Sequence, residues 1–351
     1  MTWQAIWSDR RVFRSPPTTC DAPLRAMTLW LEMIGPRRPR RPGPRRGRGP
    51  ARDIPLRLWQ GASEGEAGIN IYLMPNGAVR LIHGEIDLCT APETLRSGET
   101  LGVRYVTCAD GRSDVFELTN YDQDRIQILR SGLARVATLA DALPRVDGFL
   151  SVAHVAAVAS SAVPATDLPG VESGALVSTV QGPRPIDALR AGDEVLDDEG
   201  ASHPLRWIEA RPRLCLGRTA PICLRAPYFG LTRDLVVTPQ TRLLQRGAVV
   251  DYLCGTEAVL ANAADMATGR AVLRDRSKPM RIFYHMMLDD PACIRVENCP
   301  IETAHLGDVM ALGDRQISQI ANPMVQDLTP SLPLLDRAAA RALVTAHARA
   351  A

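Results

Sequence analysis

A Pro75-Asn76-Gly77 turn between two alternating segments is the feature that most constrains how this chain can fold. Apolar residues alternate with other residues on both sides of the turn, at Ile69, Ile71, Leu73, Val79 and Leu81. An Asn-Gly pair between segments of period two is the strongest short-range signal for a β-hairpin. A second hairpin is predicted over residues 103–118, around a turn at 109–111. Many short strands separated by turns are typical of a sandwich, so we expect a β-sandwich domain over residues 53–165.

The charge of the chain is unevenly distributed. Residues 1–52 hold 12 arginines and three acidic residues, whereas the whole chain has 41 basic and 39 acidic residues. Residues 37–48 alone contain seven arginines among prolines and glycines, and such a segment offers little apolar surface to bury. We therefore expect residues 1–52 to be a disordered Arg/Pro-rich arm that binds polyanions only weakly, through charge. The alternative is that translation begins at Met27, at Met33 or still later, so that the residues before the start are not part of the protein. The remaining body is acidic, which argues against specific binding of nucleic acid.

Hydropathy and cysteine spacing exclude several further classes of protein. No apolar run reaches the ~20 residues that a membrane helix needs. Residues 27–34 are too short, and contain an acid, for the core of a signal peptide. We expect a soluble protein without an ordinary secretion signal, either cytoplasmic or exported without a leader. The eight cysteines include no Cys-x-x-Cys pair, so we expect no disulfide framework, no metal site and no cofactor.

Residues 160–170 combine prolines with small residues and mark a boundary between two domains. Beyond it the sequence again favours short strands, which makes the predicted fold mostly β. These strands are expected at residues 175–180, 194–196, 205–209, 222–225, 235–238, 242–245, 281–288 and 293–296. A short helical turn is expected within residues 256–266.

The last part of the chain has a helical pattern. Leu335, Ala339 and Leu343 recur at every fourth position, and Ser331 precedes them as a candidate cap. This spacing predicts a C-terminal helix of about 15 residues within 329–351 that docks on the protein.

Six ordered blocks between residues 168 and 312 carry the most specific pattern in the chain. The most distinctive reads Leu-Arg-Ala-Gly-Asp-Glu-Val-Leu, at residues 189–196. The blocks lie at residues 174–179, 182–196, 204–208, 234–244, 284–289 and 297–303. In order and spacing they resemble the bacterial Hint domain, the hedgehog/intein self-processing module. The resemblance assigns residues 166–315 to a Hint-like domain.

The resemblance implies an all-β, horseshoe-like domain that attacks its own backbone. In this family the first residue, Cys or Ser, adds to the carbonyl group of the preceding peptide bond and forms a thioester or ester. The histidine of a Thr-x-x-His motif protonates the amide nitrogen that leaves. Strain near the bond that breaks assists the reaction.

The sequence departs from the family pattern at the positions that carry this chemistry. With the blocks aligned on Gly174, the nucleophile falls at Gly170, which has no side chain. The Thr-x-x-His motif begins with Thr238 but ends with Thr241 in place of histidine. The later family histidine falls at Pro291. These three departures predict a degenerate processing site.

Three side chains remain as candidates for residual catalysis. Thr238 keeps its family position, and His285 follows Tyr284 as in the family motif. Ser173 is a hydroxyl nucleophile only if the register shifts by three residues, and it would still lack a proton donor.

The predicted function is that of a Hint-domain protein that has lost autoproteolysis and acts as a binding or scaffold protein. One alternative is residual self-cleavage between positions 170 and 173. Another is recognition of carbohydrate or a cell-surface polymer, because residues 54–160 resemble concanavalin- and laminin-G-like sandwiches at the level of fold. The sequence identifies no other partner.

Overall fold

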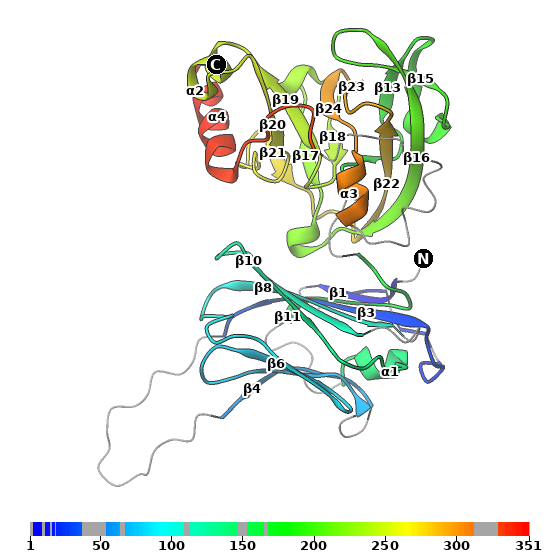
Figure 1. The fold of residues 1–351 in the computed structure, drawn as a ribbon, viewed down its shortest axis with the longest axis vertical. Helices are drawn as coiled ribbons and strands as arrows, with labels where there is room; N and C mark the ends of the chain where they lie inside the picture. The colour runs from blue at the N-terminus through cyan, green and yellow to red at the C-terminus, as the bar shows by residue number, and fades with distance from the viewer. Residues whose placement is uncertain are drawn as a thin grey trace, which may run out of the picture. The chain divides into compact units, whose positions relative to one another are not determined.

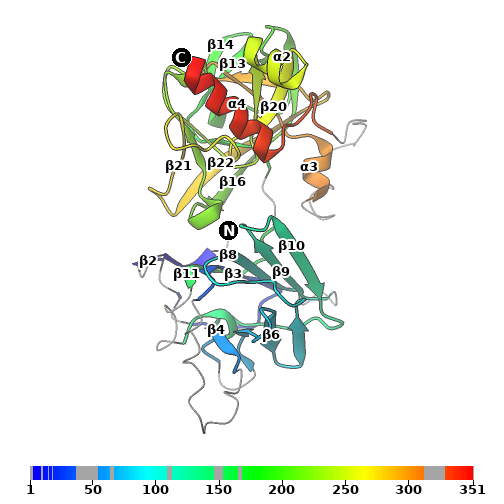
Figure 2. The ribbon, with the colours of Figure 1, turned by 90° about the vertical axis from the view of Figure 1, so that its left-hand side faces the viewer.

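The computed structural model describes residues 3–8, 11–14, 16–17, 19–36, 54–63, 67–108, 113–145, 153–164, 168–311 and 329–350. The chain divides into two compact units, Met1–Val163 and Pro164–Ala351 (Figure 1, Figure 2). Both are built from antiparallel strands with a few short helices, so the predicted mostly-β fold is confirmed. No helix in the described part of the chain is long and apolar enough to cross a bilayer.

The first unit is a two-layer β-sandwich. Its larger sheet has the order β10-β9-β8-β3-β11-β1-β2, and its smaller sheet has the order β4-β5-β6-β7. The strands of the larger sheet are β1 Trp3–Ser8, β2 Arg11–Arg14, β3 Ala26–Ile34, β8 Thr100–Cys108, β9 Val115–Asn120, β10 Arg125–Arg130 and β11 Ala153–Ala159. Those of the smaller sheet are β4 Leu56–Gln60, β5 Asn70–Leu73, β6 Val79–His83 and β7 Ile86–Cys89. A single-turn helix, α1, spans Leu139–Ala142.

Both predicted hairpins belong to this sandwich. Strands β5 and β6 pair antiparallel around Gly77, whose φ of 82° requires glycine. Strands β8 and β9 form the second hairpin. The apolar residues that alternate along these strands lie in one core between the two sheets.

The expectation of a disordered arm over residues 1–52 is wrong for its described part. Strand β3 lies inside the larger sheet, between β8 and β11, and β1 pairs with β11. The physical reason is local: apolar residues alternate along β3 and turn one face of the strand into the core. These residues are Met27, Leu29, Leu31 and Met33, and all are fully buried. The Arg-rich residues 37–48 lie outside the described residues.

The second unit is a continuous, strongly bent arrangement of 13 paired strands. Its order is β20-β19-β24-β23-β13-β15-β16-β22-β12-β18-β17-β21, with β14 paired to β13. The strands are β12 Val171–Glu172, β13 Leu176–Thr179, β14 Gly182–Pro185, β15 Glu194–Leu196, β16 Ser202–Leu214, β17 Ile222–Leu224, β18 Leu235–Val237, β19 Arg242–Arg246, β20 Ala258–Asn262, β21 Val272–Arg274, β22 Met280–Leu288, β23 Cys293–Val296 and β24 Cys299–Glu302. The long β16–β22 pair forms one side of the unit and positions the site described below.

In the described part of this unit, three α-helices accompany the strands: α2 Ala248–Cys254, α3 Leu306–Ala311 and α4 Arg337–Ala350. Of the stretch 256–266, in which a helical turn was expected, residues 258–262 form β20, and a single turn follows it, closed by the Met266 N–H to the Asn262 carbonyl at 3.2 Å. Helix α4 is the C-terminal helix. Its cap is Asp336, whose Oδ1 accepts the N–H of Ala339 at 2.8 Å. Ser331 instead donates its hydroxyl to Glu302, at 2.7 Å.

Candidate functional site

The shortest strand of the second unit places one peptide bond at the centre of the candidate site. Strand β12 lies between β18 and β22, where Val171 pairs with both Val237 and Tyr284. The Pro169–Gly170 peptide therefore enters the sheet directly beside Thr238, which follows β18, and His285 in β22. This is the bond that the family alignment places at the point of cleavage.

Two buried threonines hold this peptide through hydrogen bonds. The N–H of Gly170 donates to Thr241 Oγ1 at 3.0 Å, and the same hydroxyl lies 3.0 Å from the carbonyl oxygen of Gly170. Thr238 donates its backbone N–H to the Gly170 carbonyl at 2.9 Å and its hydroxyl to the Leu168 carbonyl at 2.8 Å. Both threonines are completely buried. Thr241, at the position of the family histidine, thus accepts a hydrogen bond from the amide nitrogen that the histidine would protonate.

His285 contacts the other side of the same peptide. Its Nδ1 lies 2.8 Å from the carbonyl oxygen of Pro169. Because a carbonyl oxygen carries no proton, Nδ1 is the ring nitrogen that donates. Burial lowers the pKa of His285 to about 4, against the opposing effect of the hydrogen bond, and the charges of Arg211 and Arg213 lower it further. The imidazole is therefore neutral at physiological pH and acts here as a hydrogen-bond donor to the carbonyl group.

The space beside Gly170 is occupied. A Cβ atom on this residue would lie 2.5 Å from Nδ1 and 2.6 Å from Cε1 of His285, and 3.1 Å from the carbonyl oxygen of Tyr284. Real Cβ atoms do not approach ring atoms this closely, so no side chain fits at Gly170 while His285 keeps its position. The site therefore lacks a nucleophile and also lacks the room for one.

The arrangement orients a peptide bond, and positions 170 and 241 lack the nucleophile and the histidine of the family pattern. Attack on the Pro169 carbonyl needs a nucleophile on the following residue, and Gly170 provides none. Departure of the Gly170 nitrogen needs a proton donor, and the hydroxyl of Thr241 does not release its proton near neutral pH as an imidazolium does.

The other candidate residues lie apart from this cluster. Ser173 donates its hydroxyl to Asp187 at 3.0 Å and its N–H to the Ile282 carbonyl at 3.1 Å, so its described contacts include neither threonine nor His285. A backbone hydrogen bond from Gly174 lowers the pKa of Asp187. Pro291 lies half-buried in the connection between β22 and β23. Of the six candidate positions, all within the described residues, the structure thus brings together Gly170, Thr238, Thr241 and His285.

Sequence reasoning missed the acceptors that complete the cluster. The carbonyl groups of Leu168 and Pro169 are backbone atoms, which no side-chain motif reveals. Arg211 and Arg213, in β16 opposite β22, were missed as well, and only the register of that long strand pair brings them near His285. The described residues hold no group of three or more His, Cys, Asp or Glu side chains that could bind a metal ion.

Comparisons with known proteins identify the class of the second unit. Residues 169–308 match the family model of the Hint domain. This part of the chain is a Hint domain, and the resemblance read from the motif blocks is confirmed. No curated protein matches the chain.

Among solved structures, the chain is similar to the crystal structure of the LG1-3 region of the laminin α2 chain. The identity is 8% and the TM-score is 0.24. The match covers 86% of this chain and 55% of that one, so the chain spans about half the length of the laminin fragment. A similarity at this level supports no further conclusion.

Proposed function

We propose that the Hint domain of this protein does not cleave its own chain, and that the protein acts through binding. The observation that carries the proposal is the occupied space at Gly170, where His285 lies within 2.6 Å of any added Cβ. A cleaving Hint domain needs a nucleophilic side chain at this position, and this chain has neither the atom nor the volume for it.

The two losses reinforce one another. Nucleophile and proton donor act as one unit in an acyl shift, and the removal of such a unit costs nearly the whole rate rather than a share of it. Gly170 removes the first and Thr241 replaces the second. The hydrogen bonds of Thr238, Thr241 and His285 then keep the Pro169–Gly170 peptide in place as part of the sheet.

Cleavage at Ser173 has less support. Its hydroxyl is exposed and donates to Asp187, and no imidazole contacts it in the described structure. The N–H of Ser173, which belongs to the peptide bond that would break, is engaged by the Ile282 carbonyl at 3.1 Å. An acyl shift there would need a register different from the observed one.

The test is the mass of the purified full chain after incubation for days with hydroxylamine, and separately with a thiol. The expected result is a single intact mass in both. A fragment that begins at residue 170 would contradict the proposal. A fragment that begins at residue 173 and disappears in Ser173→Ala would establish residual cleavage instead.

A further inference from the structure

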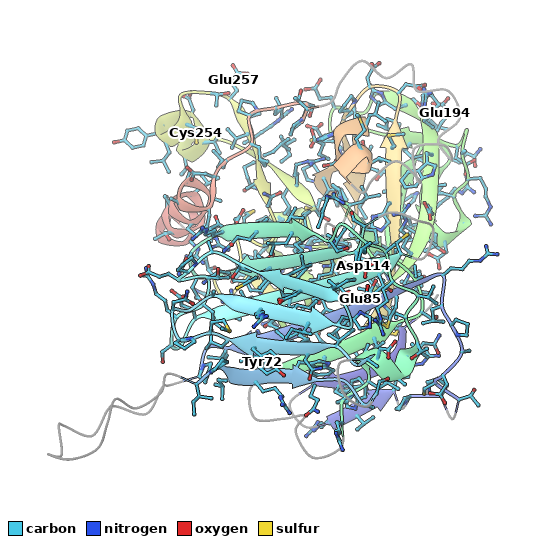
Figure 3. All side chains as sticks on the ribbon, turned by 60° about the horizontal axis from the view of Figure 1, so that its bottom comes forward. Tyr72, Glu85, Asp114, Glu194, Cys254 and Glu257 are labelled. Carbon is cyan, nitrogen blue, oxygen red and sulfur yellow. The ribbon has the colours of Figure 1, made fainter. Side chains whose placement is uncertain are left out.

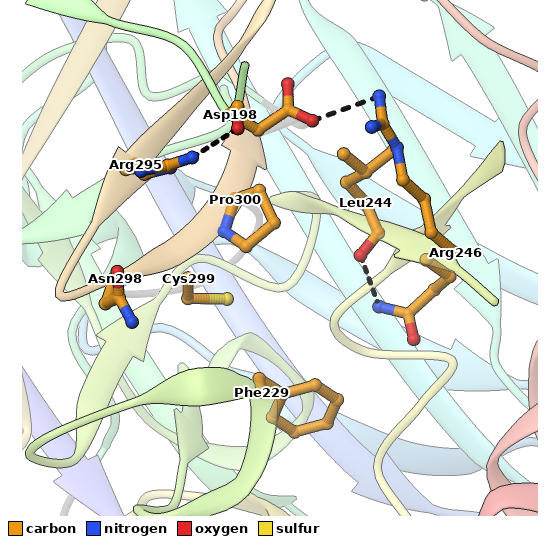
Figure 4. Close-up of a pocket in the computed structure, with 9 residues that line it drawn as sticks. Asp198, Phe229, Leu244, Arg246, Arg295, Asn298, Cys299 and Pro300 are labelled. Atoms are coloured by element: carbon orange, nitrogen blue, oxygen red, sulfur yellow. Dashed lines mark hydrogen bonds and ion pairs between the residues drawn. The ribbon is translucent and has the colours of Figure 1, made fainter. Parts of the chain in front are cut away.

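A second concave site lies in the Hint domain, on the strands β19, β23 and β24 and on three connecting segments that supply Asp198, Phe229 and Asn298. Its volume is about 560 Å³, within the range of small-molecule sites. It shares no lining residue with the Pro169–Gly170 site. Its lining residues are Asp198, Phe229, Leu244, Gln245, Arg246, Arg295, Asn298, Cys299 and Pro300 (Figure 4).

Arg295 supplies a guanidinium group without a carboxylate partner. It lies in β23 opposite Pro300 of β24, and it is half-buried. Its guanidinium donates to the backbone carbonyl of Asp198, and within the described residues it forms no ion pair. The fork of N–H groups on a guanidinium matches the two oxygens of a carboxylate. An unpaired arginine on a cavity wall therefore favours an anionic ligand.

Arg246 faces the same cavity with its charge partly balanced. Its guanidinium lies 3.0 Å from Asp198 Oδ2 and 3.4 Å from the carboxylate of the exposed Glu199. Of the residues that line the cavity, two are cationic and one, Asp198, is anionic. Both Asp198 and Glu199 pair with Arg246 through their carboxylates, whereas Arg295 has no ion pair within the described residues, so Arg295 is the cation of the lining left for a carboxylate ligand.

Phe229 supplies a flat apolar surface at the cost of backbone strain. Its φ and ψ are 59° and 22°, in the left-handed region that an aromatic residue rarely adopts. Gly230 follows with φ of 75°, and Asn298 Nδ2 donates to its carbonyl oxygen at 3.1 Å. A strained residue that the surrounding structure holds in place is a marker of function, and here the strained ring lines the cavity (Figure 4).

We propose that this cavity binds a small organic carboxylate that carries a flat apolar group. The carboxylate pairs with Arg295, and the apolar group packs against Phe229 and the apolar lining at Leu244 and Pro300. This inference rests on the proposed function, in which the protein acts through binding. It adds the class of ligand and the cavity of the Hint domain that binds it.

The probe for this site is phenylacetate, with phenylacetamide as its uncharged counterpart. Titration calorimetry on the full chain is expected to show saturable binding of phenylacetate and at least tenfold weaker binding of phenylacetamide. Arg295→Gln retains a donor for the Asp198 carbonyl but loses the charge, and should weaken phenylacetate binding at least tenfold. Phe229→Leu should weaken phenylacetate more than it weakens acetate.

The matched control is Arg190→Gln, an exposed arginine of the same domain that does not line the cavity. It should bind phenylacetate as the natural sequence does. An unchanged melting temperature in Arg295→Gln verifies that the variant folds; if it does not fold, Arg295→Lys serves in its place and should bind more weakly than the natural sequence.

Three results would overturn the proposal. They are no saturable binding at millimolar phenylacetate, equal binding of the amide, and unchanged affinity in Arg295→Gln. The mass of the same samples reports cleavage separately, so failure of this proposal and failure of the proposed loss of cleavage are distinguishable.

Discussion

The imidazole of His285 occupies the space that a side chain at Gly170 would need, with Nδ1 only 2.5 Å from the position of its Cβ. The same nitrogen donates to the carbonyl oxygen of Pro169, at 2.8 Å. One side chain thus excludes a nucleophile and fixes the peptide that a nucleophile would attack. Placing a cysteine at position 170 would therefore also require moving His285.

Gly170→Ala should destabilise the Hint domain by about 1–3 kcal/mol, because the added methyl overlaps the His285 ring. His285→Ala in the same chain should relieve the overlap, so that the two changes together cost less than their sum. Urea unfolding of the four members of this cycle measures the coupling.

The matched control for Gly170→Ala is Gly132→Ala. A Cβ on Gly132 meets nothing within 4 Å, and its φ is not positive, so this change should stay within about 0.5 kcal/mol. Equal effects of the two substitutions would show that the space at Gly170 is not closed.

The stability of the Hint domain should fall as the pH falls from about 6.5 to about 4. The folded pKa of His285 is about 4 and its ordinary value is 6.5, so in this window the unfolded chain binds a proton that the folded chain does not. Stability therefore rises with pH across the window, by roughly 3 kcal/mol for this one group.

His285→Asn isolates this contribution. The asparagine amide retains a donor for the Pro169 carbonyl but does not titrate. Other groups, such as His305, whose pKa burial also lowers, titrate in both proteins, so their effect cancels when the two pH profiles are compared. Calorimetric melting from pH 7 to pH 4 should give a flatter profile for the variant. Parallel profiles would mean that His285 is not buried in its neutral form.

Thr241→Val should cost the Hint domain about 1–3 kcal/mol. The change keeps the shape of the side chain but leaves the N–H of Gly170, which now donates to Oγ1 at 3.0 Å, without its acceptor in a completely buried site. Thr241→Ser keeps the hydroxyl and should cost clearly less. If denaturant unfolding shows that Thr241→Val costs no more than Thr241→Ser, the hydrogen bond between the Gly170 N–H and Thr241 Oγ1 does not contribute the expected stability.

The buried carboxylate of Asp141 should make the stability of the sandwich sensitive to acid, in a lower pH range than that of His285. Burial opposes ionisation of Asp141, but hydrogen bonds from the Ser63 hydroxyl and the Thr138 N–H, with His83 Nε2 at 3.8 Å, outweigh it and lower the pKa to about 2. A depressed carboxylate pKa stabilises the fold above the unfolded value near 3.8, and this stabilisation is lost as the pH falls through about 2.

The expected loss from Asp141 over that window is roughly 2 kcal/mol. Asp141→Asn should remove the stabilisation that the ionised carboxylate supplies. The melting temperatures of the variant and of the natural sequence should therefore differ less at pH 2 than at pH 6. Asp114, whose pKa burial raises, lies in the same sandwich, and Asp114→Asn should not give this pattern (Figure 3). A constant difference for Asp141→Asn across the pH range would contradict the assignment.

The strands of the Hint domain could be predicted because motif blocks and alternation coincide there. Strands β19 and β23 lie within a residue of their predicted ranges, 242–245 and 293–296. The geometry of the site could not be predicted, because its central contacts join side chains to backbone carbonyls across strands far apart in the sequence. His285 was a candidate for its motif, but only the fold shows that its ring fills the space at Gly170.

The arm was predicted wrongly because its charge was averaged over 52 residues. Seven of its arginines lie in residues 37–48, whereas residues 26–34 contain one acid, no base and an alternating apolar pattern. Strand β3 then buries that pattern between the two sheets. Hydropathy and charge read in windows of strand length, about 5–6 residues, separate residues 26–34 from residues 37–48. The net charge of residues 1–52 as a whole does not separate them.

Leu29→Ala should therefore destabilise the sandwich by about 2–5 kcal/mol, since Leu29 is fully buried in the core beneath β3. Val12→Ala, on the exposed edge strand β2 where Val12 is 57% accessible, is the matched control and should change stability by less than about 0.5 kcal/mol. Four of the five tryptophans belong to this unit, so tryptophan fluorescence in a denaturant titration reports its unfolding. Truncating a side chain on a packed sheet face leaves a cavity that its neighbours cannot fully close, so Leu29→Ala should unfold at a lower denaturant concentration than Val12→Ala. Equal unfolding midpoints for the two variants would mean that β3 is not part of the core.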